Sequence, residues 1–401
     1  MTQQTPHSGR AVAATAGEPG SGHNPGPGEW QAVHTFYAAN PQPLLVSCIR
    51  PLIASLEEDG LLAGHFFLNY WLEGPHVRLR LKPATADATA EVRRRAEEAI
   101  DAFLRSRPAL YEVDTGFLNE FYNALFEIEF PKGDRGAFMG EDGRMNLRAN
   151  NSRSWEQYAP EYAKYGGEAG VDLAEWHFAH SSDLVINAFG TMNLHMRTVL
   201  LGTSAQLMMV MLSCFLPDER KQADYLDAYY EFWHRAFPGT GFIGSAEYDR
   251  NYAETAPGLG RRYREIRQAV AAMRSGGTSP AAEGDNAGDE VRLPAFLQGW
   301  SRHCLELRER AAELARRGEL VFASPEETAA EPVTDLAVVL PTLLSPYMHM
   351  TNNRLHVTIR DEAYLAHVLG RVLRADLEGV DGGSGNEGSG EANSPSPVVR
   401  S

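Results

Sequence analysis

Residues 76–81 read HVRLRL, a strict alternation of polar and apolar side chains that an extended strand divides between two faces. The three apolar residues fall on one face, and His76, Arg78 and Arg80 fall on the other. The aromatic segment 66–71 comes shortly before, with Glu-Gly-Pro between the two. This pattern predicts an antiparallel hairpin with one core face and one polar face.

The rest of the chain predicts more helix than strand. Helical spacing of apolar residues predicts helices over residues 43–58 and 88–105, while residues 126–130 alternate like another strand. In the second half, helices are predicted over residues 171–237 with breaks near Gly202 and Pro217, 294–316, 334–345 with a break at Pro341, and 347–375. The expected fold class is therefore α+β, with antiparallel strands in the N-terminal part packed against a largely helical C-terminal part.

Three segments contain too much Gly, Pro, Ser and charge to bury much apolar surface. We expect disordered tails at residues 1–29 and 376–401 and a flexible surface loop at residues 275–290. A single ordered domain is expected over residues 30–375.

The charge balance excludes some classes of partner. Lys and Arg number 37 and Asp and Glu number 53, so the net charge is −16. Direct nucleic-acid binding and docking on an anionic membrane need clustered positive charge, and neither is expected. The three cysteines are far apart in the sequence, which is typical of a reducing cytoplasm. No run of about 18 apolar residues occurs, so no stable membrane insertion is expected.

The polar face of residues 76–81 is the first candidate site. It gathers one imidazole and two guanidiniums, and Arg side chains match carboxylates through paired N–H donors. The implied ligand is an anion. The alternative is an edge strand whose basic face is simply solvated.

The second candidate is the segment YAPEYAKYGGEAG, residues 158–170, which leads into a long helix. Its Gly-Gly pair allows a backbone turn that few other residues adopt. This would place Lys164 and Tyr165 at a helix N-terminus, where an anion can be held. The alternative is a turn between helices with exposed charges.

The third candidate is the segment YMHMTNNRLHV, residues 347–357. His349 lies between two methionines in an apolar stretch, as a buried structural histidine does. Asn353 and Arg354 follow at helical spacing, and this favours a polar cluster instead.

Signatures of cofactors are missing from the sequence. His177 and His180 lack acidic or Cys companions at metal-ligand spacing, so no metal site is expected. There is no phosphate-binding loop, no dinucleotide fingerprint and no GxSxG. We therefore expect no cofactor.

Taken in order, these motifs resemble a known family. Gly-Pro-His-x-Arg-x-Arg, Tyr-x-x-Glu-x-x-Lys-Tyr-Gly-Gly and His-Met-x-x-Asn-Arg resemble the C-terminal elimination domain of class I lantibiotic dehydratases, also called the thiopeptide-type bacteriocin biosynthesis domain. The opening WQAVHTFYAANPQPLLVSCIRPLI is similar to the start of that domain as well. The resemblance extends from about Trp30 to Arg374.

The resemblance implies a function. In that family a glutamylation domain esterifies Ser or Thr of a ribosomal precursor peptide, using glutamyl-tRNA. The elimination domain then removes glutamate and leaves dehydroalanine or dehydrobutyrine. The length leaves no room for a glutamylation domain, so we expect a stand-alone glutamate-eliminating lyase. It would act in the cytoplasm on a glutamylated precursor peptide, with a separate glutamylation protein as partner.

Two alternatives stay open. A stand-alone relative in thiopeptide pathways instead catalyses a formal [4+2] cyclisation of two dehydroalanines, which forms a pyridine and ejects the leader peptide. The other alternative is a subunit that only binds the precursor peptide.

The resemblance also assigns roles. The family's essential arginine and histidine positions correspond to Arg78, Arg80 and His349. The arginines would grip the leaving glutamate, and His349 would act as general acid or base. We expect these three groups to converge, since they must act on one ester. The residues expected to bind substrate are His76, Lys164, Tyr165, Asn353 and Arg354.

The chain departs from the family pattern at two positions. The family often has Arg where this chain has Asn69, and usually has Arg where it has Lys164. Lys keeps the charge but loses the forked donor geometry. The Arg-containing segment 131–154 is expected either to restore an arginine or to form a substrate-specific loop.

Overall fold

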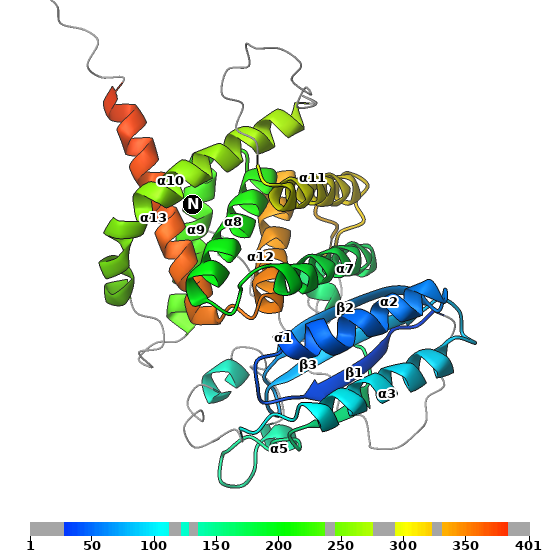
Figure 1. Ribbon diagram of the computed structural model, residues 1–401. Coiled ribbons are helices and arrows are strands. Elements are labelled where there is room, and N and C mark those ends of the chain that lie inside the picture. Colours follow the sequence, from blue (N-terminus) through cyan, green and yellow to red (C-terminus); the bar gives the residue numbers. More distant parts are fainter. Residues whose placement is uncertain are drawn as a thin grey trace, which may run out of the picture.

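The computed structural model describes residues 28–111, 122–127, 135–236, 245–275, 293–322 and 331–383. It has an antiparallel sheet in the N-terminal part and a largely helical remainder (Figure 1). The predicted α+β class is therefore confirmed. The tail at residues 1–29 and the loop at residues 275–290 lie almost wholly outside the described residues.

The sheet has four strands in the order β2-β3-β1-β4, and each is antiparallel to its neighbours. The strands are β1 (Gln31–Phe36), β2 (Leu62–Tyr70), β3 (His76–Pro83) and β4 (Ser152–Glu156). β2 and β3 form the predicted hairpin. Its turn contains Glu73 and Gly74, both with positive φ, and Gly74 N donates to the carbonyl of Trp71 at 3.0 Å.

One face of the sheet is covered by α2 (Arg50–Glu58) and α3 (Thr89–Ser106), as Figure 1 shows. The apolar side chains of β3 point to this face and are almost fully buried. α3 meets them with a stripe of apolar residues one turn apart: Val92, Ala96, Ile100 and Phe103. Burial of each large apolar side chain contributes about 1.5–3 kcal/mol. The arginines of β3 are left on the opposite face.

The helix predicted over residues 43–58 is present, but one turn of it is widened. α1 (Gln42–Leu44) leads into a π-helical turn, Leu45–Ile49, and then into α2. Pro51 has no N–H, and its ring crowds the carbonyl four residues earlier. The preceding turn opens, and Arg50 N donates to the carbonyl of Leu45, five residues back.

The short helix α5 (Arg135–Phe138) precedes β4 in the sequence, and the short helix α6 (Tyr162–Tyr165) follows it. The long helices are α7 (Glu168–Thr191), α8 (Arg197–Phe215), α9 (Glu219–Ala236), α10 (Ser245–Arg274), α11 (Ala295–Arg316), α12 (Leu336–Arg354) and α13 (Ile359–Gly383). α8 contacts α10, α11 and α12, and α13 packs along α9 (Figure 1).

α8 has the length and composition of a membrane-spanning helix, with a mean hydropathy of 1.6 over its most apolar window. However, 67% of that window is buried inside the protein. Every residue from Leu207 to Phe215 is buried by neighbouring helices. The apolar composition is accounted for by this packing, as in the core helix of a globular protein.

The edge strand β2 is joined to the helical part through its backbone. Phe67 N donates to Ser182 Oγ on α7 at 3.1 Å, and Asn69 N donates to Asn353 Oδ1 on α12 at 2.9 Å. The amide of Asn353 returns a bond to the carbonyl of Asn69 at 2.8 Å. Side chains thus satisfy donors that would otherwise be open to another strand. These bonds fix how α7 and α12 sit against the sheet.

Three predicted features are wrong. Residues 122–127 are helical, so residues 126 and 127 do not start a strand; residues 128–130 lie outside the described part. α8 runs through Gly202, and the break comes between Thr191 and Arg197 instead. α12 continues through Pro341 and Pro346. Packing of its apolar residues overrides the local effect of a missing N–H.

The C-terminal boundary also differs from the predicted one. α13 continues to Gly383, beyond residue 376, where the tail was predicted to start. Leu377 explains part of the extension, because its side chain packs against the core. Residues 384–401 lie outside the described part.

Candidate functional site

His76 and Arg78 form a fixed pair on the polar face of β3. The Nδ1 of His76 lies 2.8 Å from the carbonyl of Gly74, and Arg78 Nε donates to His76 Nε2 at 3.1 Å. Nε2 must accept and Nδ1 must donate, so the ring is neutral. Burial, and then the charge of Arg78, lowers the pKa of His76 to about 3. The guanidinium of Arg78 lies 3.4 Å from the centroid of the Tyr70 ring.

His34 is a member of this cluster that the sequence analysis missed. It lies on β1 directly opposite Arg78, and its ring stacks on His76 with centroids 5.0 Å apart. His34 is buried, and its Nε2 has no hydrogen-bond partner among the described residues. Burial, followed by the charges of Arg80 and Arg78, lowers its pKa strongly. The residue is therefore a neutral polar group facing a cationic surface.

Arg80 is a buried cation with unfilled donors. Its side chain is 4% exposed, and neither Nε nor Nη1 has a hydrogen-bond partner within the described ranges. Its guanidinium lies 5.4 Å from the centroid of Tyr158. Burial, and then the charge of Arg78, lowers its pKa to about 9. Leaving such donors unpaired costs about 1–3 kcal/mol or more, and a bound anion would offset that cost.

Arg354 is a second buried guanidinium, on α12. Its Nε donates to Ser182 Oγ at 3.2 Å and its Nη1 donates to the carbonyl of Met350 at 2.9 Å. Nη2 has no partner in the described part of the chain. Burial lowers the pKa of Arg354 to about 9, and Tyr158 offsets part of the effect, as it does for Arg80. The guanidinium of Arg354 lies 4.4 Å from the centroid of Phe178, and Phe178 and Tyr158 both pack on Phe66. Arg80 and Arg354 thus line one aromatic wall, made of Tyr158, Phe66 and Phe178.

Tyr165 packs on Phe178 of this wall, and the ammonium of the more exposed Lys164 lies 5.8 Å from the centroid of the Tyr165 ring. Tyr165 is buried, stacks on Tyr347 with centroids 6.0 Å apart, and burial raises its pKa to about 12. Its electrostatic interaction with Arg354 connects it to α12. Lys164 is partly exposed and forms an ion pair with Glu161 at 3.2 Å. The two predicted substrate-binding neighbours thus have different surroundings.

The Gly-Gly turn holds Tyr165 in place. Gly166 and Gly167 both have positive φ, as the motif predicts. α7 begins right after them, at Glu168, slightly earlier than the predicted start. Gly170 is required for a different reason, because a Cβ there would lie 1.7 Å from the carbonyl oxygen of Tyr165.

His349 lies in a separate cluster among the helices. Its Nδ1 is 2.9 Å from Oε2 of Glu362 on α13, and its ring faces Trp233 of α9 with centroids 5.4 Å apart. The side chain is 27% exposed, so the ring is not sealed from solvent. Glu362 is a second residue that the sequence analysis missed.

The position of His349 on α12 relates it to the sheet. Asn353 lies one turn later on the same side of the helix and bonds to Asn69 of β2. Asn69 precedes Tyr70, whose ring lies under Arg78. Asn353 therefore serves as a contact between α12 and the hairpin. That His349 converges with Arg78 and Arg80 on one substrate stays a prediction.

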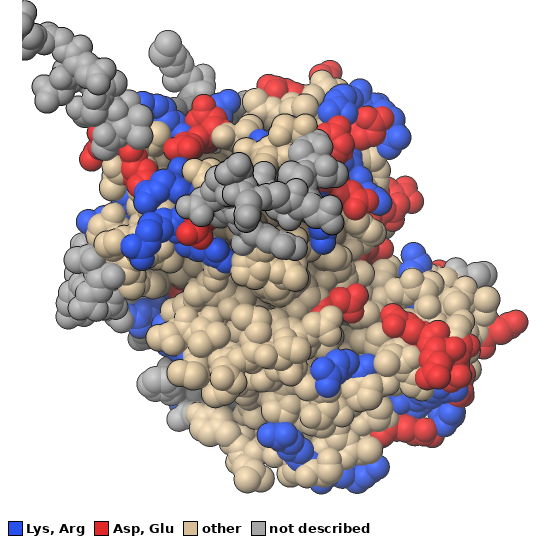
Figure 2. All heavy atoms as spheres, turned by 45° about the horizontal axis from the view of Figure 1, so that its top comes forward, with Lys and Arg blue, Asp and Glu red and all other residues tan. Residues whose placement is uncertain are grey.

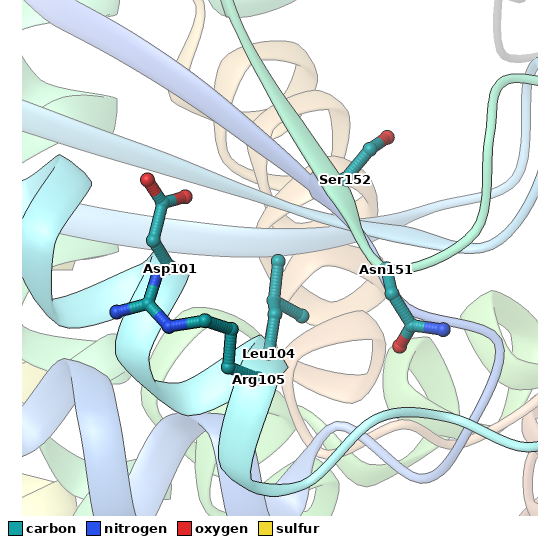
Figure 3. Close-up of a pocket in the computed structure, with 5 residues that line it drawn as sticks. All are labelled: Asp101, Leu104, Arg105, Asn151 and Ser152. Atoms are coloured by element: carbon teal, nitrogen blue, oxygen red, sulfur yellow. The ribbon is translucent and has the colours of Figure 1, made fainter.

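A shallow pocket lies elsewhere, at the outer edge of the sheet (Figure 3). Asp101, Leu104 and Arg105 come from the end of α3, and Asn151 and Ser152 come from the start of β4. Asp101 is held by Arg153 at 2.7 Å, and Asn151 bonds to the backbone of Ala109. None of the candidate catalytic or substrate-binding residues lines it, although Asn151 and Ser152 belong to the segment 131–154, which was predicted either to restore an arginine or to form a substrate-specific loop.

The described residues contain no group of three or more His, Cys, Asp or Glu side chains that could hold a metal ion. On the face shown in Figure 2, basic and acidic side chains are interspersed. Ion pairs among the described residues include Arg94 with Glu91 and Glu98 on α3, and Arg310 with Glu306 on α11.

Three solved structures are similar to this chain. The pyridine synthase TbtD from thiomuracin biosynthesis superposes with a TM-score of 0.63 at 20% identity, over 88% of this chain and 99% of that chain. TsrL superposes with a TM-score of 0.59 at 16% identity, over 87% and 95%. The tRNA-dependent lantibiotic dehydratase MibB from Microbispora sp. 107891 gives a TM-score of 0.48 at 16% identity, over 91% of this chain and 29% of that chain. The first two show a shared fold.

No curated protein matches the sequence. The family model described as "Lantibiotic biosynthesis dehydratase C-term" matches residues 30–373, nearly the whole of the predicted domain. The chain therefore belongs to the lantibiotic dehydratase C-terminal family, and so to the biosynthesis of ribosomally made peptide antibiotics.

Proposed function

We propose that this protein eliminates glutamate from glutamylated Ser or Thr residues of a precursor peptide. The observation that carries the proposal is the buried guanidinium of Arg80, whose Nε and Nη1 lack a partner among the described residues. Arg78 lies two residues away on the same face of β3. Such a pair is suited to a carboxylate, and the leaving group of this reaction is a carboxylate.

The reaction consists of three changes at the substrate, which the protein must assist. A base removes the Cα proton of the esterified residue, the electron pair forms the Cα=Cβ bond, and the Cβ–O bond breaks to release glutamate. Arg78 and Arg80 would stabilise the negative charge that develops on the leaving group. His349 would carry the proton, because its ring is partly exposed and its Nδ1 is already held.

The other predicted residues have supporting roles in this proposal. Arg354 would bind a second anionic group of the substrate through its unfilled Nη2. Tyr165 and His76 would shape the walls of the site, and Asn353 would keep α12 in register with β2. Lys164 would bind substrate only by exchanging its ion pair with Glu161.

The partners follow from the reaction. The substrate is a ribosomal precursor peptide glutamylated by a separate protein that uses glutamyl-tRNA, and the site of action is the cytoplasm. A net charge of −16 accords with a chain that does not bind tRNA itself. No cofactor is needed, since proton transfer and charge stabilisation suffice for the elimination.

A second candidate is the pyridine-forming [4+2] cyclisation of two dehydroalanines. It is favoured by the state of two positions where family members carry arginine. Asn69 is engaged with Asn353, and Lys164 is engaged with Glu161, so both offer less to a glutamate than an arginine fork would. Cyclisation does not expel glutamate and needs fewer carboxylate-binding groups.

One experiment separates the candidates. A glutamylated precursor and a fully dehydrated precursor are each incubated with the purified protein and analysed by mass spectrometry. Loss of glutamate from the first, with the second unchanged, supports elimination. Release of the leader peptide from the second supports cyclisation. If the protein binds both peptides and changes neither, it is the non-catalytic binding subunit.

A further inference from the structure

A fully buried carboxylate lies beneath the imidazole of His349. Glu362, in the first turn of α13, is 1% exposed. Its Oε2 accepts from His349 Nδ1 at 2.9 Å, and its Oε1 accepts from Tyr229 Oη at 2.5 Å and from Asn352 Nδ2 at 3.1 Å. Asn352 Oδ1 in turn accepts from Ser204 Oγ at 2.7 Å. The carboxylate of α13 is thus surrounded by donors from α9 and α12.

These bonds determine the charge of Glu362. Burial raises the pKa of this carboxyl, but the interactions with His349, Tyr229 and Asn352 outweigh it and the pKa is lowered. The N-terminus of α13 adds favourable partial charge. Glu362 is therefore ionised, and an ionised carboxylate can only accept hydrogen bonds.

The charge of Glu362 in turn determines the tautomer of His349. Because Oε2 can only accept, the proton of the neutral imidazole must lie on Nδ1. Nε2 then carries a free lone pair on the side of the ring away from Glu362. The ring is packed against Trp233 and cannot easily turn over. An ionised, buried glutamate is costly to a fold, and orientation of a reactive imidazole is a role that would retain it.

We infer that Glu362 is a positioning residue that holds the His349 imidazole with Nδ1 protonated and Nε2 directed to substrate. This inference rests on the proposed function for the role of Nε2. It extends the predicted site to α13, α9 and α8, through Glu362, Tyr229 and Ser204. Glu362 contacts His349 directly, and Tyr229 is linked to His349 through its hydrogen bond to Glu362. Tyr229 stays protonated because burial raises its pKa.

The first test is spectroscopic and does not depend on turnover. Nitrogen NMR of the wild-type protein, labelled in its histidine rings, is compared with that of Glu362→Gln, with His349→Ala used to assign the signal. We expect His349 to be protonated on Nδ1 in the wild type and to lose this preference in Glu362→Gln. A neutral wild-type ring protonated on Nε2 and not on Nδ1 would overturn the inference.

The second test is kinetic. We expect Glu362→Gln to lower kcat by about 10²-fold or more, with KM changed little. The same substitution in a His349→Ala background should have no further effect, because the two residues act as one unit. Equal losses in both backgrounds would show that Glu362 acts only on stability. Tyr229→Phe, which keeps the Glu362–His349 bond, is the matched variant and should lower kcat by less than tenfold.

The two tests separate the inference from the proposed function. If the wild-type protein eliminates no glutamate and the ring is still protonated on Nδ1, the proposed function fails and the positioning of His349 stands. If elimination occurs and the ring is protonated on Nε2, the positioning fails and the proposed function stands. If Glu362→Gln does not fold, the nitrogen NMR spectrum of the wild type and the kcat of Tyr229→Phe test the inference instead.

Discussion

The two polar clusters of this protein are built in opposite ways. At the sheet, His34 and Arg80, together with Arg354 of the adjoining helix α12, each keep a buried nitrogen without a partner in the described part of the chain. Among the helices, both oxygens of Glu362 are engaged by donors. Unfilled cationic donors indicate that a ligand completes the first cluster, while filled acceptors indicate that the second is rigid before any ligand arrives.

The difference assigns complementary tasks. A site that binds a leaving carboxylate must have donors free, because bonds to the protein itself would compete with the ligand. A group that moves a proton must be held in one orientation and protonation state. Edge strand β2 joins the two clusters, through Asn69 to Asn353 and through Phe67 to Ser182.

The largest expected effect comes from removal of the unfilled cation. Arg80→Gln should lower elimination by about 10²–10³-fold, because one preorganised charge on the leaving group is lost. Glutamylated peptide should accumulate, as seen by mass spectrometry. Arg78→Ala should act in the same direction, since it shares the polar face of β3 and leaves the core face untouched.

Arg94→Gln on the exposed side of α3 is the matched control and should keep full activity. The stability of Arg80→Gln should be unchanged or higher, because an unpaired buried charge is removed. Insoluble Arg80→Gln, rather than soluble and inactive protein, would show that the arginine is structural and would break the comparison.

The pH dependence of stability should separate the two clusters. Burial first, and neighbouring charges second, lower the pKa of His34 and His76 on the sheet, His76 to about 3. The same causes lower the pKa of His303 between α7 and α11 to about 2. Below the ordinary value of 6.5, the unfolded chain binds protons that the folded chain does not. As the pH falls below this value, each histidine should therefore lower the free energy of unfolding by about 1.4 kcal/mol per pH unit, until the pH reaches its pKa in the folded protein.

Glu362 should affect the free energy of unfolding at a lower pH than the histidines do. Its pKa is lowered from the ordinary value of 4.5, so its contribution is present above 4.5 and is lost as pH falls further. Urea unfolding from pH 7.5 down to about pH 3 would measure both effects. Arg80→Met should end this loss of stability at a higher pH, because Arg80 is one of the charges that lower the folded pKa of His34 and His76. A flat profile from pH 6.5 to 5 would contradict the neutral, buried state of these rings.

How much of this was predictable from sequence differs between the clusters. The alternation of HVRLRL identified the polar face of β3 correctly, since side-chain direction in a strand follows from local period alone. His34 was missed because β1, QAVHTF, lacks this alternation, and a lone His beside Ala and Val gives no sign of which strand lies opposite. Its position facing Arg78 follows from the register of β1 with β3.

Glu362 could not be found by any local pattern. It pairs with His349 across the turn between α12 and α13, and in sequence it is one of several acidic residues in a helix start. Its burial depends on α9, more than a hundred residues earlier. The prolines of α12 failed as a break signal for the same reason, since packing against α7, α8 and α11 decides the helix.

A substitution in the first turn of α7 should test the aromatic wall that Arg80 and Arg354 share. Gly170→Ala places a Cβ against the carbonyl of Tyr165, which cannot move away freely because it is backbone. We expect a loss of about 1–3 kcal/mol in the free energy of unfolding, measured in urea, together with weaker substrate binding. Gly202→Ala in α8 is the matched control, because its Cβ would meet nothing within 4 Å, and it should be neutral or stabilising. A stable Gly170→Ala protein would show that the turn can relax.

The smallest expected effect on activity concerns Ser182, the residue of α7 that forms the joint between the two clusters. Ser182 Oγ accepts from both Phe67 N and Arg354 Nε, so Ser182→Ala leaves two buried donors unfilled at once. We expect a loss of about 1–3 kcal/mol, because an unfilled buried donor costs more than a bond contributes when it is made. Ser213→Ala is the matched control, since that hydroxyl only donates to Met209 of its own helix. Ser213→Ala should cost less than about 1 kcal/mol.

Elimination by Ser182→Ala should fall only a few-fold, since Arg354 keeps its bond to Met350 and Arg80 is untouched. If Ser182→Ala instead loses activity as severely as Arg80→Gln while remaining folded, then the joint controls the geometry of both clusters, and their separate roles would have to be abandoned.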